Sequence, residues 1–195
     1  MIQTKGKLFI LLALSMGLIV ALSNYLVQFP VPFFNLEKFL TYGAFTYPIA
    51  FLITDLANRS YGVKVAKKIV YFGFFLGVVL TLYFSTNFSD LISIRIAIGS
   101  GSAFLIAQLV DIYIFDTLRK KVWFLAPLGS SIIGSIIDTF IFFSISFYGT
   151  GINWVTLSIG DLTVKIFIAL LMLIPFRIFI SYIKEVSNLD KKVSV

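Results

Sequence analysis

The chain has 195 residues, of which 59% are hydrophobic and only 13% are charged. Soluble domains normally carry about a quarter charged residues, so this composition excludes an ordinary soluble domain and indicates a single membrane domain covering residues 1–195. Cys and His are both absent, which excludes disulfides, thiolate chemistry, haem attachment and zinc held by these residues. No cofactor or metal is therefore expected.

Apolar stretches long enough to cross a bilayer recur along the chain, and we predict an all-α protein with six transmembrane helices. In chain order they cover about residues 8–29, 40–57, 69–86, 91–118, 125–147 and 159–183. A cleaved signal peptide is the alternative for the first stretch, because Lys5 and Lys7 precede it and small residues follow at 21–23. The uncharged run continues from Leu8 to Leu36, and this length favours an uncleaved helix.

Basic residues are sorted between the connections. Most of the 16 Lys and Arg residues lie before the first span, after the last, or in the second-to-third and fourth-to-fifth connections: Lys5, Lys7, Arg59, Lys64, Lys67, Lys68, Arg119, Lys120, Lys121, Arg177, Lys184, Lys191 and Lys192. Cytoplasmic loops are enriched in Lys and Arg, so both termini are predicted to be cytoplasmic. The net charge of +7 is then a topology signal, and no nucleic-acid partner is expected.

One face of the fourth span combines small and charged residues. At every fourth position it carries Arg95, Gly99, Ala103, Ala107 and Asp111. A spacing of four keeps these side chains on one inclined face, and small residues let a neighbouring helix approach closely. We therefore expect both charges, and Gln108 one turn before Asp111, to lie inside the bundle.

The fifth span repeats this design. Ser130, Gly134 and Asp138 are spaced by four, and Ser131 and Ser135 flank them. Together the two spans are expected to present two carboxylates, one amide and several hydroxyls to a shared interior.

Two interpretations of these buried polar groups are possible, because polar residues inside a membrane face a partner, a cavity or a substrate path. Arg95, Asp161 and Lys165 lie near the outer ends of their spans, where structural pairing is favoured: Arg95 or Lys165 with Asp138, and Asp161 with Lys165. For Gln108, Asp111 and Asp138 we favour a functional role.

At the end of the second span, Asp55, Asn58 and Arg59 fit a helix cap and interface anchor as well as they fit a site. A pocket of convergent polar groups among aromatic rings suits a small neutral molecule, although two Asp residues could instead serve protons or cations.

Enzymatic activity is not expected. The stretch GSGSAF at 99–104 lacks the third glycine and the preceding strand of a dinucleotide fingerprint. SIGD at 158–161 departs from the signature of intramembrane aspartyl proteases, and without His a serine has no imidazole base.

Four blocks resemble the queuosine precursor transporter family, also called the vitamin uptake-like transporter or YhhQ family. They are TYPIAFLITDLANRSYGVKVAKKIVYFGF (46–74), RIAIGSGSAFLIAQLVDIYIFDTLRK (95–120), APLGSSIIGSIIDTFIFFSISFYG (126–149) and GDLTVKIFIALLMLIPFR (160–177). Many members have Glu where this chain has Arg59 followed by Ser60.

The resemblance implies six helices like those of the substrate-binding components of energy-coupling-factor transporters. It also implies a multi-pass protein of the cell membrane that takes up 7-deazaguanine precursors of queuosine, such as 7-cyano- and 7-aminomethyl-7-deazaguanine. The matching polar positions are Asp55, Asn58, Arg95, Gln108, Asp111, Ser130, Ser131, Asp138, Asp161 and Lys165. Of these, the residues expected to bind the substrate are Asp55, Asn58, Arg95, Gln108, Asp111, Ser131 and Asp138.

A 7-deazaguanine base presents N–H donors on its amide and amino groups and an acceptor on its carbonyl, and its ring can stack on aromatic faces. The carbonyl could be served by Gln108, Ser131 or a cation. The expected contacts are Asp111 or Asp138 on the donor edge, Gln108 on the carbonyl edge, and Phe104 or Phe142 on the ring.

Three alternatives stay open. The chain has no ATP-binding motif, so it could be the substrate-binding subunit of an ATP-driven vitamin or base uptake system. It could also be a proton-coupled carrier of another small solute, or a structural membrane protein whose polar residues only pack. No energising partner or oligomeric state is indicated by the sequence.

Overall fold

The computed structural model describes residues 2–38, 40–85 and 91–182, which form six long α-helices and one short 3-10 helix. In chain order they are α1 (Ile2–Leu26), η1 (Phe33–Lys38), α2 (Gly43–Tyr61), α3 (Val63–Ser85), α4 (Leu91–Leu118), α5 (Leu125–Phe147) and α6 (Trp154–Tyr182). The predicted all-α architecture is confirmed. Two helices start before the predicted membrane spans 69–86 and 159–183: α3 starts at Val63, directly after Gly62 at φ 79°, and α6 starts at Trp154.

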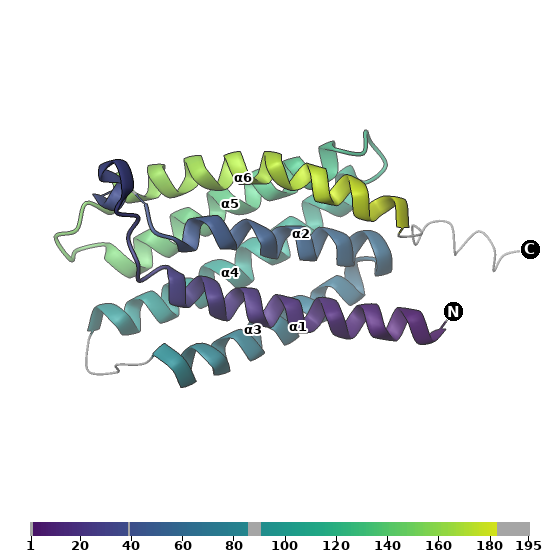
Figure 1. Ribbon diagram of the computed structural model, residues 1–195, viewed down its shortest axis with the longest axis horizontal. Coiled ribbons are helices and arrows are strands. Elements are labelled where there is room, and N and C mark those ends of the chain that lie inside the picture. Colours follow the sequence, from purple (N-terminus) through teal and green to yellow (C-terminus); the bar gives the residue numbers. More distant parts are fainter. Residues whose placement is uncertain (1, 39, 86–90, 183–195) are drawn as a thin grey trace, which may run out of the picture.

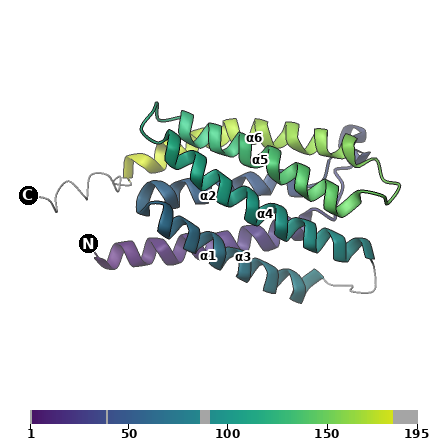
Figure 2. The ribbon, with the colours of Figure 1, turned by 180° about the vertical axis from the view of Figure 1, so that it is seen from behind.

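The six helices run side by side along one axis (Figures 1 and 2). α1 begins and α6 ends at the same end of the bundle, which we call the terminal end. η1 and the α5–α6 connection lie at the opposite end, which we call the loop end. Within the segment before α2, Val31 N–H donates to Leu40 O at 3.0 Å and Tyr42 N–H donates to Phe29 O at 3.0 Å, so the chain around η1 forms a closed loop.

Four helices in the described part of the chain are long and apolar enough to cross a membrane: Lys7–Leu26, Ile94–Leu118, Leu125–Phe147 and Trp154–Ser181. Large apolar side chains such as Leu18, Phe75, Phe140 and Phe167 are exposed on the outside of the bundle. An apolar exterior of this kind is suited to lipid, and the protein is a multi-pass membrane protein.

α2 is the central helix. It packs against each of the other five long helices, and 13 of its 19 residues are buried. A helix enclosed by other helices does not need a lipid-facing apolar surface. This position explains why α2 carries Thr54, Asp55 and Asn58 and is not among the four helices found long and apolar enough to cross a membrane.

Glycines allow the closest helix contacts. A Cβ atom on Gly99 of α4 would lie 2.5 Å from Ser146 Oγ of α5, so the prediction that the small face of the fourth span admits a neighbour is confirmed. A Cβ on Gly134 of α5 would lie 2.6 Å from the ring of Phe51, which therefore occupies the space between α2 and α5.

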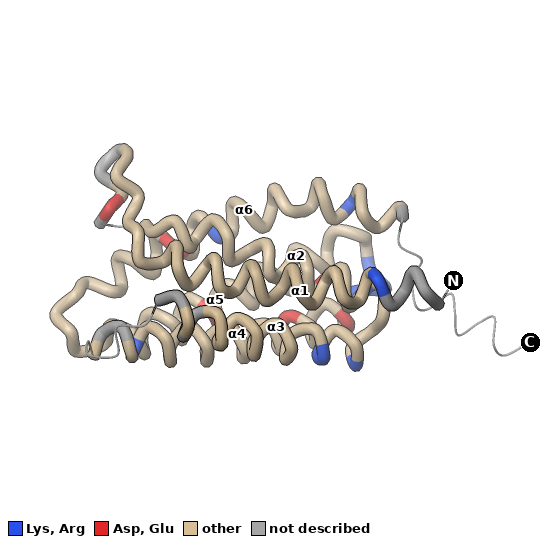
Figure 3. The backbone as a smooth tube through the Cα atoms, turned by 60° about the horizontal axis from the view of Figure 1, so that its bottom comes forward, with Lys and Arg blue, Asp and Glu red and all other residues tan. Residues whose placement is uncertain are grey.

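Basic residues gather at the terminal end (Figure 3). Lys64, Lys67 and Lys68 are exposed near the start of α3, and Arg119 and Arg177 lie near the ends of α4 and α6. Lys184, Lys191 and Lys192 lie outside the described residues, as do the side chains of Lys5 and Lys38. The predicted charge asymmetry is thus seen between the two ends of the bundle.

Candidate functional site

Polar side chains occupy two layers inside the bundle. α2, α4 and α5 each carry one member of each layer at a spacing of eight residues: Tyr47 and Asp55, Ser100 and Gln108, Asp138 and Ser130. Eight helical residues correspond to a rise of about 12 Å. Since α5 runs opposite to α2 and α4, Asp138 lies toward the loop end and Ser130 toward the terminal end.

The layer nearer the loop end is an ion-pair cluster, which we define as Tyr47, Asp138, Thr139, Asp161 and Lys165. Lys165 Nζ lies 2.8 Å from Asp138 Oδ2 and 2.6 Å from Asp161 Oδ2. Thr139 Oγ1 donates to Asp161 Oδ2 at 2.9 Å and accepts from Lys165 at 3.2 Å. The Lys165 ammonium also lies 5.1 Å from the centre of the Tyr47 ring. Both predicted pairings of Lys165 are confirmed.

A narrow cavity adjoins the ion-pair cluster, with room for about one water molecule. Its lining consists of Asn24, Val27, Gly43, Tyr47, Ser100, Asp138, Phe142, Asp161 and Lys165. The Tyr47 hydroxyl lies 3.1 Å from Ser100 Oγ and donates to Asn24 Oδ1 at 3.4 Å. The cavity therefore brings polar groups from five helices next to the ring of Phe142.

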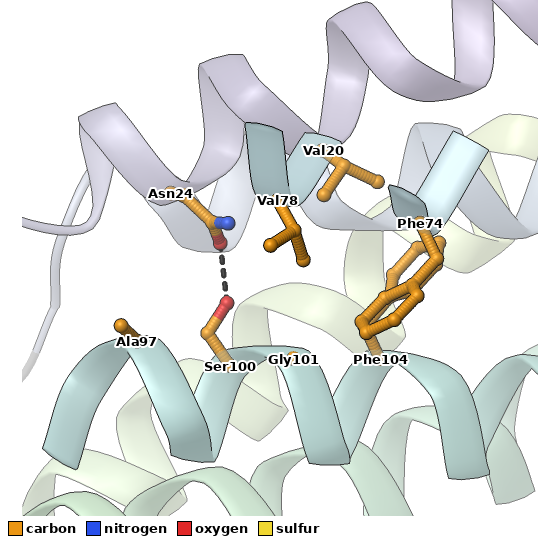
Figure 4. A pocket seen from close by; sticks show the side chains of 8 residues that line it. All are labelled: Val20, Asn24, Phe74, Val78, Ala97, Ser100, Gly101 and Phe104. Atoms are coloured by element: carbon orange, nitrogen blue, oxygen red, sulfur yellow. Dashed lines mark hydrogen bonds between the residues drawn. The ribbon is translucent and has the colours of Figure 1, made fainter. Parts of the chain in front are cut away.

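A second small cavity shares Asn24 and Ser100 with the first (Figure 4). Ser100 donates a hydrogen bond to Asn24 across it, and apolar side chains line the other side. There Phe104 stacks on Phe74, with ring centres 6.4 Å apart and planes inclined by 10°. Phe104 and Phe142, the two predicted stacking residues, thus line adjoining cavities.

The layer nearer the terminal end is a carboxyl cluster, which we define as Thr54, Asp55, Gln108, Asp111 and Ser130. All five side chains are buried, with exposed fractions of 1% or less. Ser130 Oγ donates to Asp55 Oδ1 at 3.2 Å, and the Thr54 hydroxyl donates to Gln108 Oε1. Three polar atoms of this cluster have no hydrogen-bond partner among the described residues: both carboxyl oxygens of Asp111 and the amide nitrogen of Gln108.

Asn58 and Arg119 join the end of α2 to α4. Asn58 Nδ2 donates to Ile112 O at 2.9 Å, and Arg119 Nη2 donates to Asn58 Oδ1 at 2.5 Å and to Asn58 O at 2.9 Å. Arg119 also forms an ion pair with Asp116 at 2.9 Å. Asn58 therefore connects α2 with α4 and with the residue that follows it.

Arg95 has a structural role at the end of α5. Its Nε donates to Ile145 O at 2.9 Å and its Nη2 donates to Tyr148 O at 2.7 Å. The last carbonyls of a helix lack helical partners and favour a cation. Of the two cations expected to reach Asp138, Lys165 makes the contact, and Arg95 binds carbonyls instead.

The sequence predicted one shared interior, and the structure divides it. Asp138 and Phe142 line the ion-pair cavity and Phe104 the adjoining one, whereas Asp55, Gln108 and Asp111 belong to the carboxyl cluster. Ser131 is buried beside Ser130 on α5.

Sequence reasoning missed Asn24, Tyr47 and Thr139. Asn24 and Tyr47 are isolated polar groups in apolar spans. No other polar residues at helical spacing accompany them to indicate an inward-facing site. Thr139 follows Asp138 directly, and a hydroxyl of this kind is common in apolar helices.

Comparisons with known proteins identify the family. The family described as "Putative vitamin uptake transporter" matches residues 41–180. A "Probable queuosine precursor transporter" of Haemophilus influenzae is 33% identical over 89% of this chain and 86% of its own length. The "Queuosine precursor transporter" of Escherichia coli is 30% identical over 81% of this chain and 79% of its own length. A "Probable queuosine precursor transporter" of Bacillus subtilis is 28% identical over 80% and 78%.

No solved structure matches the chain. The match at 41–180 covers most of the described helices and includes both clusters, whereas Asn24 and Val27, which line the cavity beside the ion-pair cluster, lie outside it. These relatives are transporters and not enzymes, in agreement with the absence of a catalytic motif. The chain therefore belongs to the family of vitamin uptake transporters that includes the queuosine precursor transporters.

Proposed function

We propose that this protein imports a queuosine precursor, a 7-deazaguanine base such as 7-cyano- or 7-aminomethyl-7-deazaguanine, across the cell membrane. Three relatives named as queuosine precursor transporters align over most of the chain and support this substrate class. The topology that we propose has six transmembrane helices with both termini in the cytoplasm, because the basic residues gather at the terminal end. The loop end then faces the outside.

The base binds at the ion-pair cluster in this proposal. The observation that carries it is the pair of adjoining cavities, which combine acceptors, donors and aromatic rings within one layer of the bundle. Asp138 is suited to accept N–H groups from the base, and Lys165 to donate to its carbonyl oxygen. Phe142 or Phe104 supplies the stacking face. Of the two carboxylates expected on the donor edge, Asp138 is the one that lines a cavity.

Gln108 lies about 12 Å further toward the terminal end than Ser100, given the rise of 1.5 Å per residue, and Asp111 lies about one helical turn beyond Gln108. In the proposed path, an imported base passes this deeper layer after it leaves the ion-pair cluster. Their unpartnered amide and carboxyl groups are available for the same contacts that the sequence predicts, so we retain them as residues of the path.

Binding requires an opening motion, because the cavity at the ion-pair cluster admits about one water molecule and a bicyclic base is several times larger. The segment around η1 is suited to this motion. Val27 and Gly43 at its two ends line the cavity, and Leu36 and Leu40 line an apolar hollow of about 380 Å³ against α6. Displacement of this segment from α6 would open the site toward the loop end.

The proposal is tested by uptake of 7-cyano-7-deazaguanine into cells that cannot synthesise it, with queuosine in their tRNA as the readout. Wild type is expected to restore queuosine, and Asp138→Asn to lose most of this activity at equal membrane expression. Asp138→Asn leaves Lys165 paired with Asp161, so the bundle keeps a charge partner for the ammonium. Asp116→Asn, at the partly exposed end of α4, is the matched control.

Failure of wild-type protein to restore queuosine, despite normal amounts in the membrane, would exclude this substrate class. Restoration by wild type together with full activity of Asp138→Asn would retain the substrate and move the site away from the ion-pair cluster.

A further inference from the structure

Two carboxyl groups face each other in the carboxyl cluster. Asp55 of α2 and Asp111 of α4 are 1% and 0% exposed, and their carboxyl groups interact with each other. Two ionised carboxylates have acceptor oxygens only. A contact between them is attractive when one of them carries a proton and donates it to the other.

The surrounding donors cannot satisfy both carboxylates. Ser130 has a single hydroxyl proton, and three acceptors compete for it: Asp55 Oδ1 at 3.2 Å, Pro127 O at 3.3 Å and the nearby Asp111. Within the described residues, the oxygens of Asp111 accept from no N–H or O–H group with hydrogen-bond geometry. One carboxyl group of the pair therefore lacks a donor.

Cations on the surrounding helices are engaged elsewhere. Arg119 of α4 is bound to Asn58 and Asp116, and Lys165 of α6 lies in the other layer between Asp138 and Asp161. Arg177 of α6 lies 4.8 Å from the centre of the Trp123 ring.

The remaining basic side chains near this end are Lys7 of α1, Lys64, Lys67 and Lys68 of α3, all exposed, Lys120 and Lys121 after α4, and the half-buried Arg59 of α2. In the part of the chain that the structure describes, the groups that act on Asp55 and Asp111 are each other and Ser130.

We propose that Asp55 and Asp111 form a proton-binding site, which holds one proton between the two carboxyl groups in the substrate-free protein and releases it during transport. Two neighbouring carboxylates in a low-dielectric interior repel each other, and a shared proton replaces this repulsion with a short charge-assisted hydrogen bond. The pair titrates as a unit. The transport role rests on the proposed function, whereas the shared proton does not.

Gln108 is positioned to stabilise the form of the site that has lost its proton. Its amide nitrogen has no partner among the described residues, while its carbonyl oxygen is held by Thr54, the neighbour of Asp55. When the proton leaves, this N–H group and the Ser130 hydroxyl are the donors available to stabilise the second carboxylate. One proton enters from water on one side of the membrane and leaves to water on the other, so that one base and one proton cross together.

The shared proton is tested without substrate, by infrared spectroscopy of the purified protein in lipid at neutral pH. A protonated carboxyl group has a C=O stretch that is distinct from carboxylate bands and shifts in D₂O. We expect such a band in wild type and in the control Asp116→Asn, and its loss in the double variant Asp55→Asn/Asp111→Asn. Absence of the band in wild type, or its survival in the double variant, would overturn the proton site.

Coupling is tested in proteoliposomes with 7-cyano-7-deazaguanine. One proton per base converts a gradient of one pH unit into about tenfold accumulation, because one unit corresponds to about 1.4 kcal/mol. Wild type is expected to reach this value, and Asp55→Asn to exchange base across the membrane without accumulating it. The coupling role is overturned if wild-type accumulation ignores the pH gradient or if Asp55→Asn accumulates base normally. Absence of wild-type exchange would instead contradict the proposed substrate, and the infrared band would still decide the proton site.

Discussion

The ion-pair cluster and the carboxyl cluster both draw side chains from α2 and α5, which α6 completes in the first and α4 in the second, but their charge balance differs. In the ion-pair cluster, Lys165 holds Asp138 and Asp161 at 2.8 Å and 2.6 Å. In the carboxyl cluster, Asp55 and Asp111 meet without a cation among the described residues. The comparison shows that a buried carboxylate can be accommodated by an opposite charge or by a proton, and these two solutions predict different responses to substitution.

Removal of Lys165 should have the largest effect. Lys165→Met leaves Asp138 and Asp161 buried without their cation, and loss of one partner from a buried ion pair costs about 3–5 kcal/mol. We expect little folded protein in the membrane and a large fall in melting temperature in detergent. The triple variant Lys165→Met/Asp138→Asn/Asp161→Asn should recover much of this loss, because no charge is left unpaired. A stable Lys165→Met protein would contradict the structural importance of the cluster.

Matched Asp→Asn substitutions compare the two layers directly. Asp138→Asn removes a charged partner of Lys165, and hydrogen bonds to charged groups contribute about 1.5–3 kcal/mol. Asp111→Asn removes no cation contact, and its amide can donate to Asp55 as the shared proton does. We therefore expect a lower melting temperature for Asp138→Asn and an unchanged or higher one for Asp111→Asn. Equal destabilisation by both substitutions would mean that the carboxyl cluster is ion-paired after all.

The contact between Phe51 and Gly134, which lies between the two polar layers, provides a third substitution test. Phe51 lies four residues from both Tyr47 and Asp55, and its ring occupies the space left by Gly134. In Gly134→Ala the added methyl group would lie 2.6 Å from the Phe51 ring, and overpacking of this kind costs about 1–3 kcal/mol.

Melting temperatures of the single variant and of Gly134→Ala/Phe51→Leu test this contact. The smaller Leu side chain should relieve part of the loss, so that the two substitutions are less than additive. Full additivity would show that Phe51 does not limit the space at Gly134.

The helices could be predicted from the sequence because lipid requires long apolar segments, and this requirement is local to each span. The predicted fourth span, 91–118, coincides with α4. The predicted third span, 69–86, begins after the start of α3, because Lys64, Lys67 and Lys68 lower the apolarity of the first turns of this helix. Its true start is set by Gly62, where the backbone turns at positive φ.

The division into two clusters could not be predicted, because it depends on the relative heights and rotations of different helices. Helix periodicity placed Gln108 and Asp111 correctly on an inward face, but it does not say that Asp55 of α2 lies opposite them. Likewise, Arg95 and Lys165 were equivalent partners for Asp138 in the sequence. The structure separates them because Lys165 enters the bundle from α6, whereas Arg95 lies at the height of the last carbonyls of α5.

Asp116→Asn should have the smallest effect, and it defines the scale for the others. Asp116 is partly exposed, with 45% of its side chain accessible, and it pairs with Arg119 at i,i+3 on α4. Partly exposed ion pairs contribute about 0–1 kcal/mol, and Arg119 keeps its two hydrogen bonds to Asn58 when Asp116 is neutralised. We therefore expect a melting temperature close to that of wild type. A large fall would show that Asp116 holds Arg119 in place, so that Arg119 and Asn58 would then have to be treated as part of the charge balance around Asp55.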